Sequence, residues 1–338
     1  MMNFMEQRKK QMGVRSVGSI IKQGNLTSSY DILKAVKGPK EMDCLERPWL
    51  RGDLSLFLGA PGIGKTSTML WIFKHILLNN PDGCVVMVSL EMTAGEIIEK
   101  WLLATRDCPE ISERFYIVEN YNEDGTSKAL TANLIKHELK KIKETLNTTI
   151  IATFIDHLHQ VNINGGVDYN PVVDLFKTLA VEVDTHVFLA SQTTKGKAGK
   201  GDTPISRDGA FGTSKAEWLA TNIITIFQPL IRVQKETDLP ILAFAYQKIR
   251  YKNKRDKLKE GMNYLLYFEH ESENLRELKR QEKADFGMYY EKVLELMQNE
   301  EKFKSYQFDL SETIVGKDGK EVKLDRIIGG SKPQSEDL

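Results

Sequence analysis

Short apolar runs alternate with amphipathic stretches along most of the chain. The apolar runs lack polar alternation, which is typical of parallel strands covered on both faces. The amphipathic stretches have the spacing of helices, and Thr93 with Glu96 forms a capping box at the start of one of them. The pattern predicts strands at Leu54–Leu58, Val85–Leu90, Phe115–Val118, Ile150–Ile155, Val187–Ala190, Ile223–Phe227, Ile241–Tyr246 and Tyr264–Glu269, and helices at 65–79, 93–106, 129–146, 171–183 and 284–301.

This alternation predicts an α/β fold, with a mostly parallel central sheet flanked by crossover helices. We expect residues 1–44 to be an arm or linker for subunit or partner contact. Residues 45–280 would form the main domain, and residues 281–338 a C-terminal helix followed by a flexible charged tail.

Composition narrows the class of protein further. The chain has 338 residues, 41% of them hydrophobic, which is enough for a large core. Its 47 basic and 47 acidic residues cancel, so affinity for a polyanion must come from local clusters. Cys44, Cys84 and Cys108 fit neither a disulfide framework nor a Cys-x-x-Cys metal site. Since no segment approaches the ~20 apolar residues of a membrane span, we expect a cytoplasmic protein with no membrane contact.

Residues 59–66 have the sequence GAPGIGKT, which matches the phosphate-loop motif between an expected strand and an expected helix. Its glycines let backbone N–H groups turn toward phosphates, and the helix directs its positive dipole end at them. Lys65 would contact the β- and γ-phosphates, and Thr66 would hold Mg²⁺. We therefore expect ATP and Mg²⁺ to bind at Gly59, Pro61, Gly62, Gly64, Lys65, Thr66 and Ser67.

Two acidic residues follow neighbouring strands. Asp156 ends an apolar run and is the candidate for the second Mg²⁺ contact. Many phosphate-loop ATPases have a glutamate directly after this aspartate, but His157 occupies that position here. Ligands in open α/β sheets bind at the carboxyl ends of strands, so Glu91 can reach the same crevice as a catalytic base. The alternative is a solvated glutamate at a strand end.

Other polar residues near these strand ends are less specific. Gln192 follows a third strand and is placed to sense the γ-phosphate, unless it is only an exposed strand-end residue. His157 and His159 stand two residues apart like a metal pair. Histidines this close to a phosphate site more often pack or form hydrogen bonds.

Four segments together resemble the ATPase domain of hexameric replicative DNA helicases of the DnaB type. They are the phosphate loop, Ser-Leu-Glu-Met at 89–92, the run ending in Asp156, and Ala-Ser-Gln at 190–192. The resemblance covers residues 45–280 and implies a RecA-like fold with Glu91 as the base. It also implies that Lys248 and Arg250 reach the ATP of a neighbouring subunit. Residues two apart on an extended segment face the same way, although a solvated basic run is the alternative.

The chain departs from the family pattern in three places. Only residues 1–58 precede the phosphate loop, so we expect the N-terminal helical domain of full-length relatives to be absent. His157 and His159 interrupt the pattern that follows the aspartate. Between residues 204 and 212 the chain has Ser-Arg-Asp-Gly where the family has Asp-Leu-Arg.

Loops after the Asp strand and the Gln strand line the central channel in ring and filament motors of this fold. Here they are 162–170 and 195–207. The second is basic and glycine-rich, which favours contact with a nucleic-acid backbone, although a solvated loop is the alternative. The candidate DNA-binding residues are Lys195, Lys197, Lys200 and Arg207.

These patterns together predict an ATP-dependent helicase or translocase on single-stranded DNA. We expect it to act in DNA replication as a ring-shaped homo-oligomer, a hexamer, with a replication or loading protein as a further partner. One alternative is a RecA- or RadA-like recombinase filament. Another is an accessory ATP-switch factor that binds DNA or a replication partner. The Ser-Leu-Glu-Met sequence and the Lys-x-Arg placement favour the helicase type.

Overall fold

The computed structural model describes residues 35–39, 49–120, 129–163, 168–191, 201–205, 215–249 and 263–297, with the backbone of four short strands between 308 and 328. The chain divides into two units, Met1–Ala35 and Val36–Leu338. The description below concerns the second unit.

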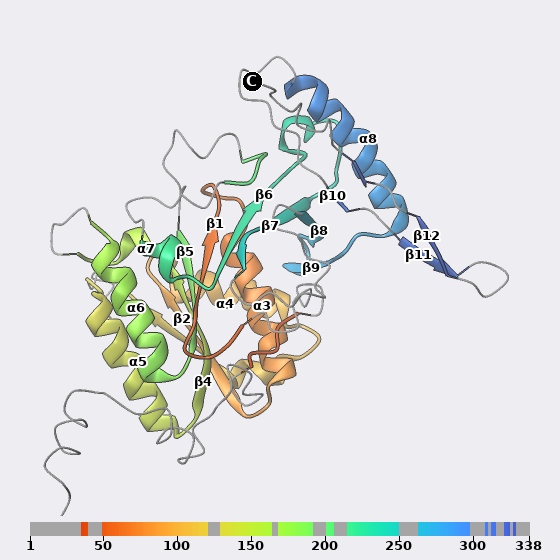
Figure 1. The fold of residues 1–338 in the computed structure, drawn as a ribbon. Coiled ribbons are helices and arrows are strands. Elements are labelled where there is room, and N and C mark those ends of the chain that lie inside the picture. Colours follow the sequence, from red (N-terminus) through yellow and green to blue (C-terminus); the bar gives the residue numbers. More distant parts are fainter. Residues whose placement is uncertain are drawn as a thin grey trace, which may run out of the picture. The chain divides into compact units, whose positions relative to one another are not determined.

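A large sheet forms the centre of this unit, as Figure 1 shows. Its strands are β1 (Leu54–Leu58), β2 (Gly83–Ser89), β3 (Phe115–Glu119), β4 (Thr149–Asp156), β5 (His186–Ser191), β6 (Asn222–Phe227), β7 (Ile241–Ile249), β8 (Asn263–Glu269), β9 (Asn274–Glu277), β10 (Phe308–Asp309) and β13 (Ile327–Ile328). Their order is β13-β10-β8-β7-β6-β1-β5-β4-β2-β3, with β9 beside β8. The hairpin of β11 (Glu312–Val315) and β12 (Glu321–Leu324) is separate.

The part of the sheet from β3 to β6 is parallel, and β7 and β8 then add antiparallel strands. In β1, β2 and β5 every residue is buried, as expected for strands covered on both faces. Side chains alternate between the faces, so Leu56 joins one apolar cluster and Phe57 the other.

Helices cover both faces of the parallel strands (Figure 1). On one face, α3 and α4 share an apolar cluster with the sheet, and on the other face α5, α6 and α7 share a second. A third cluster joins α8 to the antiparallel strands. The helices are α3 (Lys65–Asn79), α4 (Ala94–Ala104), α5 (Ala132–Leu146), α6 (Asn170–Val183), α7 (Lys215–Leu219) and α8 (Arg280–Met297).

The predicted α/β class is confirmed, and the element boundaries differ mainly at capping residues. The expected helix at 129–146 begins at Ala132, because the Thr131 side chain accepts a hydrogen bond from the Leu134 N–H and caps it. Strand β7 runs on to Ile249, so Lys248 lies within a strand. Short strands occupy part of the expected C-terminal tail. Among the described helices, none is long and apolar enough to span a bilayer.

Candidate nucleotide and metal site

The phosphate-loop sequence lies between β1 and α3, as its motif requires. Gly62 and Gly64 have φ of +73° and +92°, a left-handed conformation that side chains with a Cβ rarely adopt. Gly64 directly precedes α3, so the loop ends at the positive end of the helix dipole. The backbone geometry is therefore that of an anion-binding loop.

Lys65 is the first residue of α3 and is almost buried. Its ammonium group donates hydrogen bonds to the carbonyl oxygens of Gly59 at 3.1 Å and Ala60 at 2.8 Å. Burial lowers the pKa of Lys65, and the carboxylates of Asp156 and Glu91 oppose this shift. A desolvated cation held in an amide-rich loop suits a phosphate contact.

Thr66 and Asp156 meet although they are 90 residues apart in the chain. The Thr66 hydroxyl donates to Asp156 Oδ2 at 2.6 Å, and Asp156 lies buried at the end of β4. Burial raises the pKa of Asp156, while the Thr66 hydrogen bond and the Lys65 charge oppose the rise. A hydroxyl beside a carboxylate is an oxygen donor set of the kind that Mg²⁺ prefers, so these two residues fit the predicted ion.

Glu91 lies beside this pair because β2 and β4 are neighbours in the sheet. Ser89 is in register with Asp156, and the Leu90 N–H donates to the Asp156 carbonyl oxygen at 2.9 Å. One ligand atom from each of Glu91, Asp156 and His157 lies within 4.8 Å of the others. The strand-end carboxylate therefore lies next to the candidate Mg²⁺ residues.

His157 contacts Glu91 directly. Its Nδ1 lies 2.9 Å from Glu91 Oε2, and the His157 side chain is 4% exposed, against 53% for Glu91. Burial lowers the pKa of His157, and the Glu91 carboxylate opposes the shift. His159 lies next to His157, with ring centroids 5.8 Å apart, and packs against Tyr169. The predicted packing and hydrogen-bonding role of these histidines agrees with these contacts.

The turn that carries Glu91 is fixed by other side chains. The Ser89 hydroxyl donates to the Met92 carbonyl oxygen at 2.5 Å, and the Asn120 amide donates to the Leu90 carbonyl oxygen at 3.1 Å. Thr93 caps α4 through the expected capping box with Glu96. Sequence reasoning missed Asn120, whose only signal is its position after β3.

A short segment packs against the phosphate loop from the side of β6. The Gly201 carbonyl oxygen accepts a hydrogen bond from the Gln228 N–H at 2.8 Å. A Cβ on Gly201 would lie 3.2 Å from Ile63 Cδ1. Asp202 and Arg232 form an ion pair in which the two side chains are 2% and 10% exposed. Asp202 thus ties the end of the expected DNA-binding loop to the nucleotide site, a contact that sequence reasoning missed.

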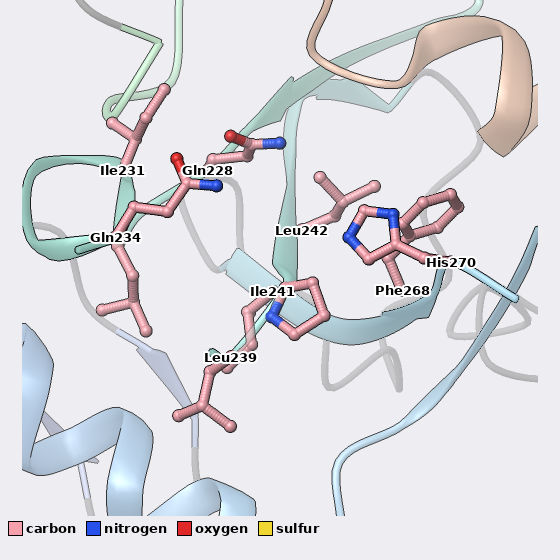
Figure 2. Close-up of a pocket in the computed structure, with 10 residues that line it drawn as sticks. Gln228, Ile231, Gln234, Leu239, Ile241, Leu242, Phe268 and His270 are labelled. Atoms are coloured by element: carbon pink, nitrogen blue, oxygen red, sulfur yellow. The ribbon is translucent and has the colours of Figure 1, made fainter. Parts of the chain in front are cut away.

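A pocket lies beside the phosphate loop, at the ends of β6, β7 and β8. Leu242 lines it and would lie 3.5 Å from a Cβ on Gly64. Figure 2 shows two side-chain amides on one side of the pocket and two rings on the other. The rings meet edge to face, with centroids 4.7 Å apart. The lining residues are Gln228, Leu230, Ile231, Gln234, Leu239, Pro240, Ile241, Leu242, Phe268 and His270.

The structure brings Lys65, Thr66, Asp156 and Glu91 together as a single cluster. Ser67 is buried in α3, where Lys100 Nζ lies 3.5 Å from its hydroxyl oxygen. Lys248 donates to the carbonyl oxygens of Glu217 and Trp218 in its own chain, so its role across an interface stays a prediction. The other predicted residues lie outside the part of the chain that the structure describes: Gln192, Lys195, Lys197, Lys200, Arg207 and Arg250.

The parallel sheet, the phosphate loop and the two strand-end acids define a RecA-like phosphate-loop fold. Solved structures with a similar fold include a DnaB-like replicative helicase studied with its primase interactions, at 18% identity and a TM-score of 0.63, covering 81% of this chain and 71% of that one. A second solved structure, of an isolated ATPase domain, is also similar, at 18% identity and a TM-score of 0.60, covering 78% of this chain and 100% of that one.

A KaiC-like protein from the hyperthermophilic archaeon Pyrococcus horikoshii OT3 is similar at 16% identity and a TM-score of 0.51, covering 72% of this chain and 98% of that one. Comparison with protein-family models gave no match, and comparison with curated proteins gave none. The predicted RecA-like fold, and the resemblance to a DnaB-type ATPase domain as a fold, are confirmed.

Proposed function

We propose that this protein is an ATP-dependent helicase or translocase that moves along single-stranded DNA as a ring-shaped oligomer during replication. The observation that carries the proposal is the cluster in which Thr66 contacts Asp156 at 2.6 Å with Glu91 beside them. It joins a phosphate-binding loop, an oxygen donor set for Mg²⁺ and a candidate base at one sheet edge. The similar fold of a DnaB-like replicative helicase supports the choice of motor.

In the proposed reaction, Lys65 and the loop amides bind the β- and γ-phosphates of ATP. Thr66 and Asp156 would hold Mg²⁺, which spreads the charge that develops on the phosphate oxygens. Glu91 accepts a proton from a water molecule whose oxygen bonds to the γ-phosphorus. The bond from that phosphorus to the bridging oxygen breaks, giving ADP and inorganic phosphate. We further propose that Gln192 senses the γ-phosphate.

The pocket shown in Figure 2 suits the base of the nucleotide. The acids follow β2 and β4 on one side of β1, whereas the pocket lies on the other side, at β6 to β8. A nucleotide with its phosphates in the loop can therefore extend away from the acids toward this pocket. The rings of Phe268 and His270 offer contact area for a base, and the amides of Gln228 and Gln234 offer hydrogen bonds.

Binding measurements can test this placement of the base. Phe268→Ala should weaken binding of Mg²⁺-ATP while leaving the affinity for inorganic tripolyphosphate unchanged, because only ATP has a base to place. Equal loss for both ligands would mean that the substitution disturbs the phosphate loop instead. Unchanged affinity for both would place the base elsewhere.

We propose that DNA contacts and subunit contacts come from the remaining predicted residues. Lys195, Lys197, Lys200 and Arg207 would neutralise DNA phosphates in the channel, and Lys248 with Arg250 would reach the neighbouring subunit's nucleotide. Arg250→Ala should bind ATP but hydrolyse it slowly. Mixing it with Lys65→Ala should restore activity at interfaces that join an intact loop to an intact Arg250. No rescue under conditions of subunit exchange would exclude a role across the interface.

The base assignment has a direct test. Glu91→Gln should retain Mg²⁺-ATP and still oligomerise, yet lose hydrolysis by at least the ~10²-fold typical of a lost general base. Lys65→Ala is the matched control, because it should weaken nucleotide binding itself. Near-normal turnover of Glu91→Gln would remove Glu91 from the mechanism.

The kind of machine is decided by its assembly on DNA. Electron micrographs with single-stranded DNA and a non-hydrolysable ATP analogue should show closed rings, and a strand-displacement assay should show ATP-dependent unwinding. Helical filaments would favour a recombinase instead. Small particles with ATPase activity that DNA does not change would favour an accessory switch factor.

A further inference from the structure

His157 occupies an unusual place in the proposed site. It follows Asp156 directly, and its ring is almost fully buried at the end of β4. Polar side chains at such depth normally have a hydrogen-bond partner. The partner of its Nδ1 is Glu91 Oε2 at 2.9 Å, although 66 residues separate the two in the chain.

The chemistry of the pair fixes which atom donates. A carboxylate can only accept hydrogen bonds, so the proton must be on Nδ1 of the histidine. The buried imidazole ring therefore donates an N–H to an acid whose side chain is half exposed. That acid lies at a strand end, where its rotatable bonds would otherwise allow several positions.

Restraint of the acid matters because of where it is held. In this hydrogen-bonded position, Glu91 lies within 4.8 Å of the Asp156 and His157 ligand atoms. A base must stay within hydrogen-bond reach of the water it activates, and small displacements are costly in rate. A carboxylate oriented by a buried third group follows the general logic of catalytic bases.

We infer that His157 is a positioning residue that holds the Glu91 carboxylate beside the Thr66–Asp156 pair through its Nδ1–H. The inference rests on the proposed function, in which Glu91 is the base. It gives a role to the histidine that stands where many phosphate-loop ATPases have their glutamate. His157 acts through Glu91, so it sets the rate of hydrolysis rather than the affinity for ATP.

Two substitutions at this position separate the hydrogen bond from the volume of the side chain. His157→Leu fills the space but cannot donate, so kcat should fall about 10-fold or more while the Kd for Mg²⁺-ATP stays within about 2-fold. His157→Asn can place an amide N–H near the position of Nδ1, so it should recover most of that loss. His159→Leu is the matched control in the same turn, and its kcat should fall less than about 3-fold.

Combination with Glu91→Gln gives the decisive measurement. If His157 acts only through the Glu91 carboxylate, His157→Leu should cause no further loss of kcat in the Glu91→Gln background. Equal losses in both backgrounds would overturn the inference, as would failure of His157→Asn to recover activity in a protein with normal thermal stability. A higher Mg²⁺ requirement with normal kcat at saturating Mg²⁺ would also overturn it, since His157 would then be a metal ligand.

The test distinguishes this inference from the proposed function. If Glu91→Gln alone keeps near-normal hydrolysis, the base assignment fails and His157 has no base to position. If Glu91→Gln loses hydrolysis while His157→Leu does not, the base assignment stands and only the positioning role fails.

Discussion

The ion pair between Asp202 and Arg232 should be among the most sensitive polar contacts in the described fold. The two side chains are 2% and 10% exposed, so both charges are largely removed from water. Asp202→Ala leaves the Arg232 guanidinium in the same buried place without its carboxylate. A charge buried in this way is costly, because solvation lost on folding is no longer compensated by the partner.

The size of the effect follows from this burial. Loss of one partner of a buried pair costs ~3–5 kcal/mol of unfolding free energy. Replacing both partners by apolar groups is often close to neutral, so Asp202→Ala combined with Arg232→Met should recover most of the loss. The exposed pair Lys292–Glu236, in which the two side chains are 49% and 53% exposed, is the matched control. Lys292→Met should leave the unfolding midpoint unchanged.

Urea denaturation, followed by tryptophan fluorescence and circular dichroism, measures these differences. The expected order of stability is wild type, then the double variant, then Asp202→Ala well below both. A loss of less than ~1 kcal/mol for Asp202→Ala would refute the reasoning, because the pair would then behave as a solvated one. A double variant as unstable as Asp202→Ala would also refute it, since the loss would come from altered packing.

Three further predictions concern the core, the loop contact and the DNA path. Burial lowers the pKa of His186 from 6.5 to about 4, so its stabilising effect is complete above pH 6.5 and is lost as pH falls toward 4. The unfolding free energy should drop by ~2 kcal/mol more between pH 7 and pH 5 than in His186→Gln. Gly201→Ala should cost ~1–2 kcal/mol in urea denaturation, because φ is +80° and the new Cβ would lie 3.2 Å from Ile63 Cδ1. Replacing Lys197 and Lys200 with Ala should flatten the log–log salt dependence of single-stranded DNA binding by ~0.7 per lost contact, while basal hydrolysis continues; an unchanged slope would exclude this path.

Much of the fold follows from local spacing in the sequence. Strand Leu54–Leu58 has the predicted bounds, because a short uncharged apolar run between turn signals has few other stable places than a covered sheet. The capping box of Thr93 and Glu96 also forms as expected, since both partners lie within one helical turn. The phosphate loop belongs to the same class, because its glycines set the local backbone.

The acids of the site were predictable only as strand-end residues. Asp156 and Glu91 each follow an apolar run, and carboxyl ends of parallel strands share one edge of a sheet, so a meeting was expected. Which strands are neighbours is not written in either run. The structure places β2 beside β4, and that adjacency puts Glu91 next to Asp156.

The sequence by itself determined the elements, the phosphate loop and the identities of the two acids. Only the tertiary structure decided that His157 contacts Glu91, that Asp202 pairs with Arg232, and that a pocket lies beside Gly64. Capping and turn signals act over a few residues, so a linear pattern contains them. Contacts across 30 or 66 residues depend on strand order and on the packing of whole elements, which arise only when the chain buries its apolar faces together.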